Sequence, residues 1–573
     1  MKLLSFDTED DSKGNVLLID FFDGEEHFTF ETAEDAEKFL CDLTGKVEIW
    51  ATNLQYDLTN IFYTRPGVCR MNYVGSRLIS AQIEGSKIYF KDTLNHWKIS
   101  VAEMGKKIGL EKLEGDLFDG TKKPSKEELI RRCHRDSEIT YFFVKKMKEK
   151  YESIGAKLKS TIGATALDHF CTNTSYKKPL KNEFSFEELV FMREGMHGGR
   201  TEVFYNKPIK GMIRAYDFNS LYPSVLAEGQ FPILNERFFT DDPDLEMEGV
   251  IHAKVRSPRD LWCPYLPCRS RDGLLFPIGT FSGTWTYFEI REALKMGYRI
   301  EKIDRALEFV GGTYNPFRHW ILENYERRLQ AQKIKDDLES DSCKLIMNNL
   351  FGKFSQGNEK TALLPITKKR LLKHSGVILE NKYILASFAS REWPEHTNYI
   401  WSMYCLAYAR DKLFRAIRSI PNCADRFLYC DTDSLFVLGD KAVFKNSKEL
   451  GELKLEGEFE EVYFKGLKNY RLTYTKEWYE KKTGKRNASK EMRTIYKVRG
   501  VPRRYANLFF EQGFVEYRKP YRLREALRRN SGKKKITPII PNFWEVTKKE
   551  NKKIYDKRKV LRNGKTEPRQ INE

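Results

Sequence analysis

Two carboxylates at the tip of an apolar hairpin constrain this chain more than any other feature. The run from Phe427 to Val437 reads FLYCDTDSLFV, so apolar residues lead into and out of Asp431 and Asp433. This pattern predicts two short strands joined by a tight turn. Carboxylates beside an apolar sheet stay ionised most readily around a divalent cation, and hard oxygen ligands suit Mg²⁺. A turn that faces water explains the tip equally well unless the chain supplies a partner carboxylate.

A partner carboxylate is expected at Asp217. The run from Ile213 to Ser224 reads as a strand that ends at this Asp, followed by a turn that Pro223 closes. The sequence therefore predicts that Asp217 and Asp433, far apart in the chain, fold to within reach of shared Mg²⁺ ions.

Length and charge indicate a large protein with a polyanionic partner. The chain has 573 residues and a net charge of +19, which predict more than one domain and a nucleic-acid-like partner. From Arg518 onward, 19 Lys and Arg residues stand against six Asp and Glu, with Tyr521 and Trp544 among them. Such a mixture is typical of surfaces that follow a phosphate backbone. A solvated tail is the alternative for Lys533–Lys535.

Targeting signals and metal-binding cysteines are not expected. Acidic residues begin at Asp7, too early for a signal peptide, and no run of about 18 apolar residues could span a bilayer. The ten cysteines are scattered, and no His/Cys cluster completes a zinc site. We therefore expect reduced thiols in a cytosolic compartment and no membrane partner.

Three acidic fragments mark the N-terminal third. Asp7 and Glu9 share one face of a predicted strand, and Asp57 opens a predicted helix. Asp136 lies in a segment of helical periodicity from Glu127 to Lys148. Acids at strand ends occur in any protein. In this order, however, a D-x-E strand, an N-x-x-[FY]-D turn and a helical Asp resemble the three exonuclease motifs of proofreading family B DNA polymerases.

The resemblance implies an RNase H-like 3′→5′ exonuclease domain over residues 1–175. Two Mg²⁺ or Mn²⁺ ions about 4 Å apart would be held by Asp7, Glu9, Asp57 and Asp136. The single strand being degraded would be held by Asn53, Tyr56, Thr93 and Leu94. Lys106 or Lys107 falls where the family carries a lysine that supports hydrolysis. Arg132 stands where the family has a water-orienting Tyr, so we expect slower hydrolysis, with a damaged nuclease site as the alternative.

The segment around Asp217 reads D-x-x-S-L-Y-P and resembles the first polymerase motif of family B. The resemblance implies that two metal ions are bound by Asp217, Phe218 and Asp433, with Asp431 assisting as a neighbouring acid. The triphosphate would be held by backbone amides after Asp217, at Ser220 and Leu221. Tyr222 would lie under the sugar and exclude a 2′-hydroxyl by collision.

Lys344, Asn348 and Phe351 are spaced to share one face of a predicted helix. Their run, KLIMNNLFGKF, resembles a further polymerase motif of the family. Lys344 would bind the triphosphate and could protonate the pyrophosphate leaving group. Asn348 and Phe351 would pack under the nascent base pair. The family usually has Ser and Tyr where this chain has Asn349 and Phe351, so nucleotide selectivity can differ.

Two short motifs predict contacts to DNA. The run Met196-His197-Gly198-Gly199, which Arg200 follows, resembles the family's Y-x-G-G linking loop with Met196 in place of the Tyr. The glycines would let the backbone approach DNA phosphates, and Arg200 would add charge. Lys468 and Tyr470 form a K-x-Y triplet that resembles the motif gripping the primer strand, at a phosphate and at the primer terminus.

All these motifs stand in family order, and the chain resembles the protein-primed family B DNA polymerases of linear-genome bacteriophages. The implied fold is a multidomain α/β and α+β chain: an exonuclease domain followed by a right-hand polymerase over residues 176–573. The palm would occupy about 190–310 and 356–475, including insertions. The fingers would occupy about 311–355, and a mainly helical thumb about 476–573.

The implied function is template-directed DNA synthesis with proofreading. A primer 3′-hydroxyl attacks the α-phosphate of a dNTP, and pyrophosphate leaves. The enzyme would be a monomer in the cytoplasm of a bacterial host. It would use a separate terminal protein as primer and displace a strand while replicating a linear viral or plasmid genome.

Two alternatives stay open. One is a nucleic-acid-primed repair or replication polymerase of the same family. The other is a non-catalytic DNA-binding protein on a polymerase scaffold, which is less consistent with intact acids at Asp217, Asp431 and Asp433 and an intact Lys344.

Overall fold

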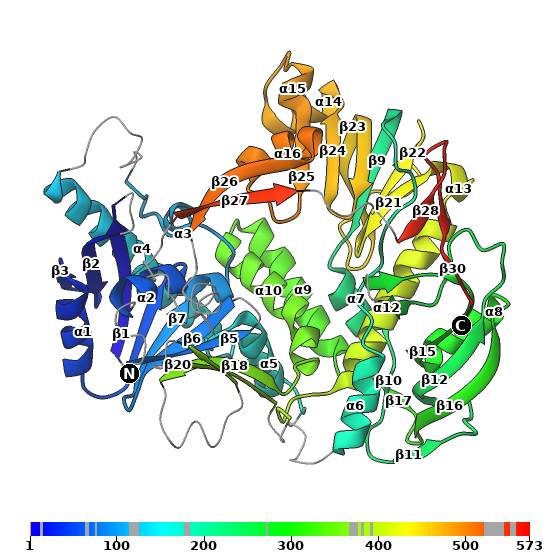
Figure 1. The fold of residues 1–573 in the computed structure, drawn as a ribbon, viewed down its shortest axis with the longest axis horizontal. Coiled ribbons are helices and arrows are strands. Elements are labelled where there is room, and N and C mark those ends of the chain that lie inside the picture. The colour runs from blue at the N-terminus through cyan, green and yellow to red at the C-terminus, as the bar shows by residue number, and fades with distance from the viewer. Residues whose placement is uncertain are drawn as a thin grey trace. The chain divides into compact units, whose positions relative to one another are not determined.

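The computed structural model (Figure 1) describes residues 2–11, 15–62, 68–74, 77–113, 125–176, 184–270, 273–365, 376–379, 383–389, 393–520, 544–550 and 557–572. The chain forms two compact units, each assembled from separate stretches of sequence. Unit 1 comprises Met1–Lys177, Arg327–Glu395 and Arg518–Thr547, and unit 2 comprises Lys178–Glu326, His396–Tyr517 and Lys548–Glu573. The basic run Lys533–Lys535 lies outside the described residues.

Unit 1 is built on a ten-stranded sheet with the order β19-β20-β18-β5-β6-β7-β4-β1-β2-β3. Strand β4 runs parallel to both β1 and β7, and the other neighbours run antiparallel. The strands are β1 (Lys2–Asp10), β2 (Val16–Phe22), β3 (His27–Phe30), β4 (Val47–Ala51), β5 (Cys69–Val74), β6 (Arg77–Ile83), β7 (Ile88–Asp92), β18 (Glu359–Pro365), β19 (Gly376–Leu379) and β20 (Tyr383–Ala389). The helices are α1 (Ala33–Asp42), α2 (Leu54–Phe62), η1 (Thr93–Asn95), α3 (Val101–Ile108), α4 (Lys126–Ser153), α5 (Ile162–Asn173) and α10 (Asp337–Phe354).

Local sequence explains much of unit 1. Strand β4 is buried at every residue, as expected for a central strand covered on both faces. Helix α4 begins with a capping box between Ser125 and Glu128 and lies against β1 and β2. Strand β18 belongs to a segment that the sequence analysis assigned to the palm, yet it pairs with β5, where Leu363 lies opposite Met71 in the core.

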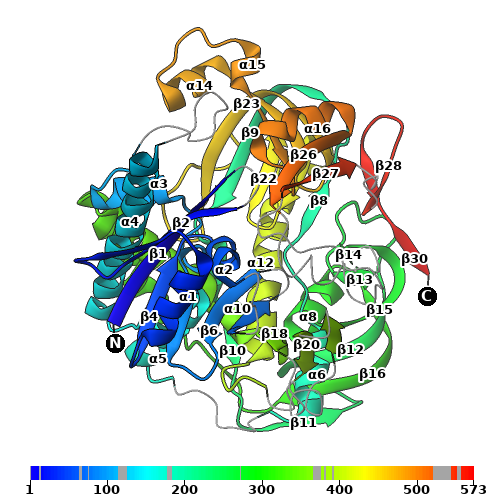
Figure 2. The same ribbon diagram turned by 60° about the vertical axis from the view of Figure 1, so that its left-hand side comes forward.

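Unit 2 contains a seven-stranded antiparallel sheet, β25-β24-β23-β9-β22-β21-β8, and a five-stranded sheet, β11-β16-β12-β15-β30. The first sheet consists of β8 (Thr201–Val203), β9 (Ile209–Phe218), β21 (Phe427–Asp431), β22 (Ser434–Leu438), β23 (Leu453–Gly466), β24 (Asn469–Tyr474) and β25 (Thr494–Val498). The second consists of β11 (Arg237–Thr240), β12 (Glu248–Arg256), β15 (Ile278–Thr286), β16 (Arg299–Phe309) and β30 (Gln570–Asn572). The C-terminal β30 runs parallel to β15, and Figure 2 shows these two strands side by side.

The remaining elements of unit 2 are shorter or connect the sheets. Two-stranded sheets are formed by β10 (Phe231–Pro232) with β17 (Thr313–Tyr314), β13 (Cys268–Ser270) with β14 (Gly273–Leu275), and β28 (Arg558–Val560) with β29 (Thr566–Pro568). The helices are α6 (Phe186–Glu194), α7 (Leu221–Glu228), α8 (Tyr287–Lys295), α12 (Tyr399–Arg418), α13 (Cys423–Arg426), α14 (Lys476–Thr483), α15 (Lys490–Arg493), η2 (Arg503–Tyr505) and α16 (Ala506–Gln512). Helix α9 (Arg318–Lys333) and strands β26 (Phe514–Pro520) and β27 (Trp544–Glu550) cross the divisions between the units.

The C-terminal region differs from the prediction. A mainly helical thumb was predicted over residues 476–573, but the described part of this region contains β25 to β30 beside short helices. β-Branched and aromatic residues, as in the TIYKV of β25, favour strands over helices. Among the described residues, no helix combines the length and the apolar run that crossing a bilayer requires.

Candidate active sites

The carboxylates that the sequence paired meet at one end of the seven-stranded sheet. Strands β9 and β22 are antiparallel neighbours, and their register places Asp217 opposite Ser434. The backbone amide of Phe218 donates a hydrogen bond to the carbonyl oxygen of Asp433 at 2.9 Å. Asp217 and Asp433 are therefore adjacent in space, and both are half-buried. Phe218 itself is buried, so only its backbone carbonyl could serve as the predicted third ligand.

The hairpin tip is held in an unusual conformation. Thr432 has a φ of 65°, a left-handed conformation that costs a β-branched residue of order 1–3 kcal/mol. Its backbone amide donates to the carbonyl oxygen of Arg200 at 2.8 Å, and the amide of Asp433 donates to the carbonyl oxygen of Asp431 at 2.7 Å. These bonds fix the direction of the two acids on either side of Thr432.

Asp431 connects the hairpin to the K-x-Y triplet. Its Oδ2 lies 2.9 Å from Nζ of Lys468, and its Oδ1 accepts a hydrogen bond from Thr201 Oγ1 at 3.2 Å. Tyr470 packs its ring against Tyr429 and Phe464 and is only 8% exposed. Asp431 is thus paired with a cation, whereas the predicted metal ligands are Asp217 and Asp433.

A basic groove of about 1570 Å³ adjoins this end of unit 2. The groove is lined by Asp431, Lys468 and Tyr470. Its lining also includes seven more cationic side chains, namely Arg471, Lys482, Lys490, Lys497, Arg499, Arg503 and Arg504. A groove of this charge and size fits the phosphate backbone of DNA.

The turn after Asp217 presents the start of α7. Ser220, at the N-cap, has a φ of 56°, and its side chain makes no capping hydrogen bond. The first amides of a helix lack intrahelical partners and favour anions, which fits the predicted triphosphate contact at Ser220 and Leu221. Leu221 is buried, so its amide rather than its side chain is available. Burial also raises the pKa of Tyr222 well above its ordinary value.

The predicted helix that carries Lys344, Asn348 and Phe351 is α10, in unit 1. Lys344 is exposed and Asn348 and Phe351 are half-buried, whereas Ile346, Met347 and Leu350 form the buried face. The predicted helix and the shared face of Lys344, Asn348 and Phe351 are thereby confirmed.

The structure corrects the prediction that Arg200, in the linking loop, contacts DNA phosphates. The predicted phosphate contact, Arg200, is 1% exposed, and its Nε donates to Oε2 of Glu202 at 2.7 Å. A Cβ on Gly199 would lie 2.8 Å from Cγ2 of Thr432, so this glycine allows the loop to pack on the hairpin tip. A Cβ on Gly198 would meet no heavy atom of the described structure within 4 Å. The charge of Arg200 is paired inside the protein with the carboxylate of Glu202, two residues further along the chain. Sequence spacing alone does not reveal that both side chains are buried.

The four predicted exonuclease acids cluster in unit 1. Asp7 and Glu9 lie on β1, Asp57 on α2 and Asp136 on α4. Thr8 Oγ1 donates to Oδ1 of Asp57 at 2.9 Å, while the buried Oδ2 of Asp57 has no hydrogen-bond partner within the described part of the chain. A buried carboxylate oxygen left without a donor fits a metal ligand.

Electrostatics support the same interpretation. Burial raises the pKa of Asp7 well above its usual range, and repulsion by Asp136, Asp57 and Glu9 adds to the shift. Burial, followed by the charge of Asp136, raises the pKa of Glu9 to about 7. Burial likewise raises the pKa of Asp57 and of Asp136. Carboxylates that repel one another in a desolvated site require cations, and two Mg²⁺ ions would supply them.

Lys112, which was not predicted from the sequence, places a positive charge beside these acids. Its Nζ contacts Oδ2 of Asp136, whereas Lys107 pairs with Asp341 at 2.9 Å. Lys107 is thus not paired with these acids, whereas Lys112, which follows the end of α3 where no periodicity marks it, is. The role in hydrolysis expected for Lys106 or Lys107 stays a prediction. The positive charge of Arg132 offsets part of the rise in the pKa of Glu9 and of Asp136. Arg132 therefore acts there as a second cation.

The predicted single-strand contacts are joined by Asp92, also unforeseen. Its Oδ1 accepts from the amide of Asn53 at 3.1 Å and from the amide of Leu94 at 2.9 Å. Thr93 Oγ1 donates to Thr52 Oγ1 at 2.9 Å. The hydroxyl of Tyr56 donates to Asp10 at 2.5 Å. The signal for Asp92 was its place as an Asp at a strand end that caps a short helix.

Among the described residues, only Asp20, His27 and His134 bring three metal-ligating atoms within 4.8 Å of one another. The two imidazole rings stack 3.8 Å apart at 9°, so their in-plane lone pairs cannot converge on one cation. Asp20 instead accepts hydrogen bonds from Ser137 at 2.6 Å and Thr29 at 3.0 Å. This cluster is a hydrogen-bond network that holds α4 against β2.

Comparisons with known proteins agree with this geometry. Residues 80–399 match the family described as DNA polymerase type B, organellar and viral. A probable DNA polymerase of Ascobolus immersus is 29% identical over 329 residues, 52% of this chain and 26% of that protein. A DNA-directed DNA polymerase of Enterobacteria phage PRD1 is 25% identical over 424 residues, 70% of this chain and 69% of that protein.

A solved structure shows the same fold. The Phi29 DNA polymerase complexed with primer-template DNA and incoming nucleotide substrates matches 96% of this chain and all of that chain, at 17% identity and a TM-score of 0.74. The predicted fold class, an exonuclease fold followed by a right-hand polymerase fold, is thereby confirmed.

Proposed function

The chain belongs to the DNA polymerases of type B found in organelles and viruses, and on that premise we propose that it synthesises DNA on a template and proofreads the product. The observation that carries the proposal is the junction of Asp217 and Asp433 at one end of the seven-stranded sheet. An acid at the end of β9 and an acid in the turn before the neighbouring β22, beside a helix start and a basic groove, provide what nucleotidyl transfer needs.

The residues have distinct proposed roles in synthesis. Asp217, Asp433 and the carbonyl of Phe218 would hold two Mg²⁺ ions, which activate the primer 3′-hydroxyl and stabilise the leaving pyrophosphate. The amides of Ser220 and Leu221 bind the triphosphate, and Lys344 adds a positive charge to it. Tyr222 excludes a 2′-hydroxyl by its bulk. Asn348 and Phe351 pack under the nascent base pair.

DNA contacts complete the proposal for unit 2. Lys468 binds a primer phosphate from the groove that it lines with Tyr470, which faces the primer terminus. Gly198 and Gly199 let the linking loop approach DNA through its backbone. The side chain of Arg200 takes no part in this contact because it is buried.

Proofreading is assigned to unit 1. Asp7, Glu9, Asp57 and Asp136 would hold two Mg²⁺ ions that activate water for attack on the terminal phosphodiester. Lys112 and Arg132 add positive charge beside these acids. Asn53, Tyr56, Thr93 and Leu94 hold the single strand, and Asp92 fixes the backbone of this surface.

For initiation we propose a terminal protein whose Ser, Thr or Tyr hydroxyl replaces the primer, with strand displacement during synthesis by a monomer in the cytoplasm of a bacterial host. This proposal rests on the motif resemblance to polymerases of linear-genome bacteriophages. A nucleic-acid-primed polymerase of the same family is the second candidate, favoured by the same acids and groove.

One experiment separates three possibilities: a protein-primed polymerase, a nucleic-acid-primed polymerase and a non-catalytic DNA-binding protein. The purified chain is incubated with a gapped template, labelled dNTPs and Mg²⁺, and synthesis, degradation and displacement are scored together. Extension that Asp433→Ala abolishes supports the polymerase, and extension that this substitution leaves unchanged supports the non-catalytic alternative. Adding a candidate terminal protein without a primer then separates protein priming from nucleic-acid priming, because only the former attaches a labelled nucleotide to protein.

A further inference from the structure

A buried charge cluster adjoins the polymerase hairpin. Arg200 and Glu202 flank Thr201 at the start of β8 and are 1% and 0% exposed. The guanidinium of Arg200 donates to Glu202 Oε2 at 2.7 Å and to the carbonyl oxygen of Pro264 at 2.7 Å. The other oxygen of Glu202 lies 3.8 Å from Nη1 of Arg558, which is 1% exposed. Two cations thus share one buried carboxylate, an arrangement that desolvation makes a poor source of stability.

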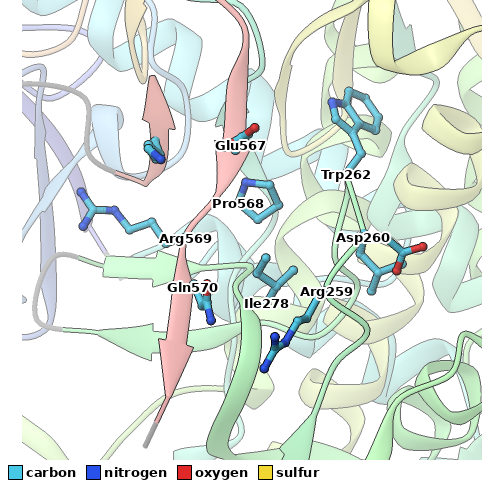
Figure 3. Close-up of a pocket in the computed structure, with 10 residues that line it drawn as sticks. Arg259, Asp260, Trp262, Ile278, Glu567, Pro568, Arg569 and Gln570 are labelled. Carbon is cyan, nitrogen blue, oxygen red and sulfur yellow. The ribbon is translucent and has the colours of Figure 1, made fainter. Parts of the chain in front are cut away.

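Arg558 belongs to the C-terminal segment, which encloses the edge strand β8. Its Nε donates to Oγ1 of Thr566 at 2.8 Å, and its Nη2 donates to the carbonyl oxygen of Trp262 at 2.9 Å. Thr566 Oγ1 in turn donates to the carbonyl oxygen of Val203 at 2.9 Å, and its amide donates to that of Phe204 at 3.0 Å. Figure 3 shows the residues that follow Thr566 in this segment, Glu567 to Gln570, beside Trp262 and Ile278. Together they line a pocket of about 690 Å³.

Strand β8 is also the element that contacts the hairpin tip. The carbonyl oxygen of Arg200 accepts the amide of Thr432 at 2.8 Å, and Thr201 Oγ1 donates to Asp431 at 3.2 Å. In the register of β8 with β21, Glu202 lies opposite Cys430. A strand of three residues at a sheet edge has few hydrogen bonds of its own, so its position depends on what covers it.

From this chain of contacts we propose that Arg558 is a positioning residue for polymerisation. It fixes β8 through Glu202 and Thr566, and β8 fixes the strained Thr432 between Asp431 and Asp433. The inference rests on the proposed function, in which Asp433 binds a metal ion. Groups that orient metal ligands without touching the metal commonly control metal affinity and rate.

The test is Arg558→Met in the full chain, with Lys559→Met as the matched control, because Lys559 lies on the same strand and is exposed. Single-turnover incorporation of one dNTP is measured across Mg²⁺ concentrations. For Arg558→Met we expect a higher Mg²⁺ concentration at half-maximal rate and a loss of about 10- to 100-fold in rate, the usual effect of such groups. Lys559→Met should match the unchanged chain, and Arg558→Lys should recover part of the Mg²⁺ response.

Circular dichroism and the melting temperature of the same samples report on folding, and the exonuclease, whose acids lie in unit 1, reports on the integrity of that unit. Wild-type Mg²⁺ dependence in a folded Arg558→Met chain would overturn the inference. Should Arg558→Met fail to fold, the milder Thr566→Val decides: a raised Mg²⁺ requirement supports positioning, and an unchanged one overturns it. If the unsubstituted chain extends no primer at all, the proposed function fails and this inference fails with it.

Discussion

The amide of Phe218 and the carbonyl oxygen of Asp433 are joined by a hydrogen bond of 2.9 Å. This bond closes a separation of more than two hundred residues and places Asp217 and Asp433 at one strand junction. The other acid of the hairpin, Asp431, has a different partner, since its Oδ2 lies 2.9 Å from Nζ of Lys468.

Asp433→Asn and Asp431→Asn should therefore differ. We expect the first to reduce primer extension by more than about 100-fold, because it removes charge from a direct metal ligand rather than from an outer partner. The second should chiefly weaken primer-template binding through Lys468, by a few-fold, since that pair is partly exposed. Extension rates and DNA affinities measured side by side would check this, with exonuclease activity as the folding control. Equal losses of rate would contradict the assignment.

The exonuclease acids predict a pH dependence of stability in EDTA. The pKa of Glu9 in the folded chain is about 7, against an ordinary value of 4.5. The folded chain then holds a proton that unfolding releases, so stability falls as pH rises between these values. Mg²⁺ should remove this loss because it binds the ionised carboxylates. Melting temperatures from pH 5 to 8, with and without Mg²⁺, would test it. Glu9→Gln should flatten the EDTA profile, and an unchanged slope in that variant would reject the prediction.

Lys112→Met should slow 3′→5′ hydrolysis by about 10- to 100-fold while primer extension persists, because Lys112 contacts Asp136 in unit 1. Lys107→Met is the matched control, since Lys107 pairs with Asp341 instead. Its surface pair should contribute only about 0–1 kcal/mol to stability. Degradation of a labelled single strand would measure both, and a larger loss in Lys107→Met would restore the lysine first expected from sequence.

Asp92→Ala should weaken single-strand binding by unit 1, because the backbones of Asn53 and Leu94 lose a shared acceptor. We also expect a loss of about 1 kcal/mol in stability, as for other helix caps. Asp92→Asn keeps an acceptor oxygen, so its affinity and stability should lie between those of Asp92→Ala and the unchanged chain. Fluorescence titration with a labelled oligonucleotide would measure affinity, and an Asp92→Ala chain that binds as tightly as the original would remove Asp92 from this role.

Local patterns determined the features that depend on neighbouring residues. Alternating apolar residues specified the hairpin around Asp431 and Asp433, and helical spacing specified the shared face of Lys344 and Asn348. The exonuclease acids were found for the same reason, since each stands at a strand end or on a helix face.

Tertiary structure decided the pairings that join distant segments. From sequence Arg200 is a candidate surface cation, and only the fold shows that it is buried and paired with Glu202. Strand β18 reads as palm until β5 pairs with it. Lys112 and Lys107 are equally plausible partners for an acid until the end of α3 directs one of them to Asp136. Charge and hydrogen-bonding capacity are properties of a residue, but the partner that satisfies them is set by burial and long-range packing.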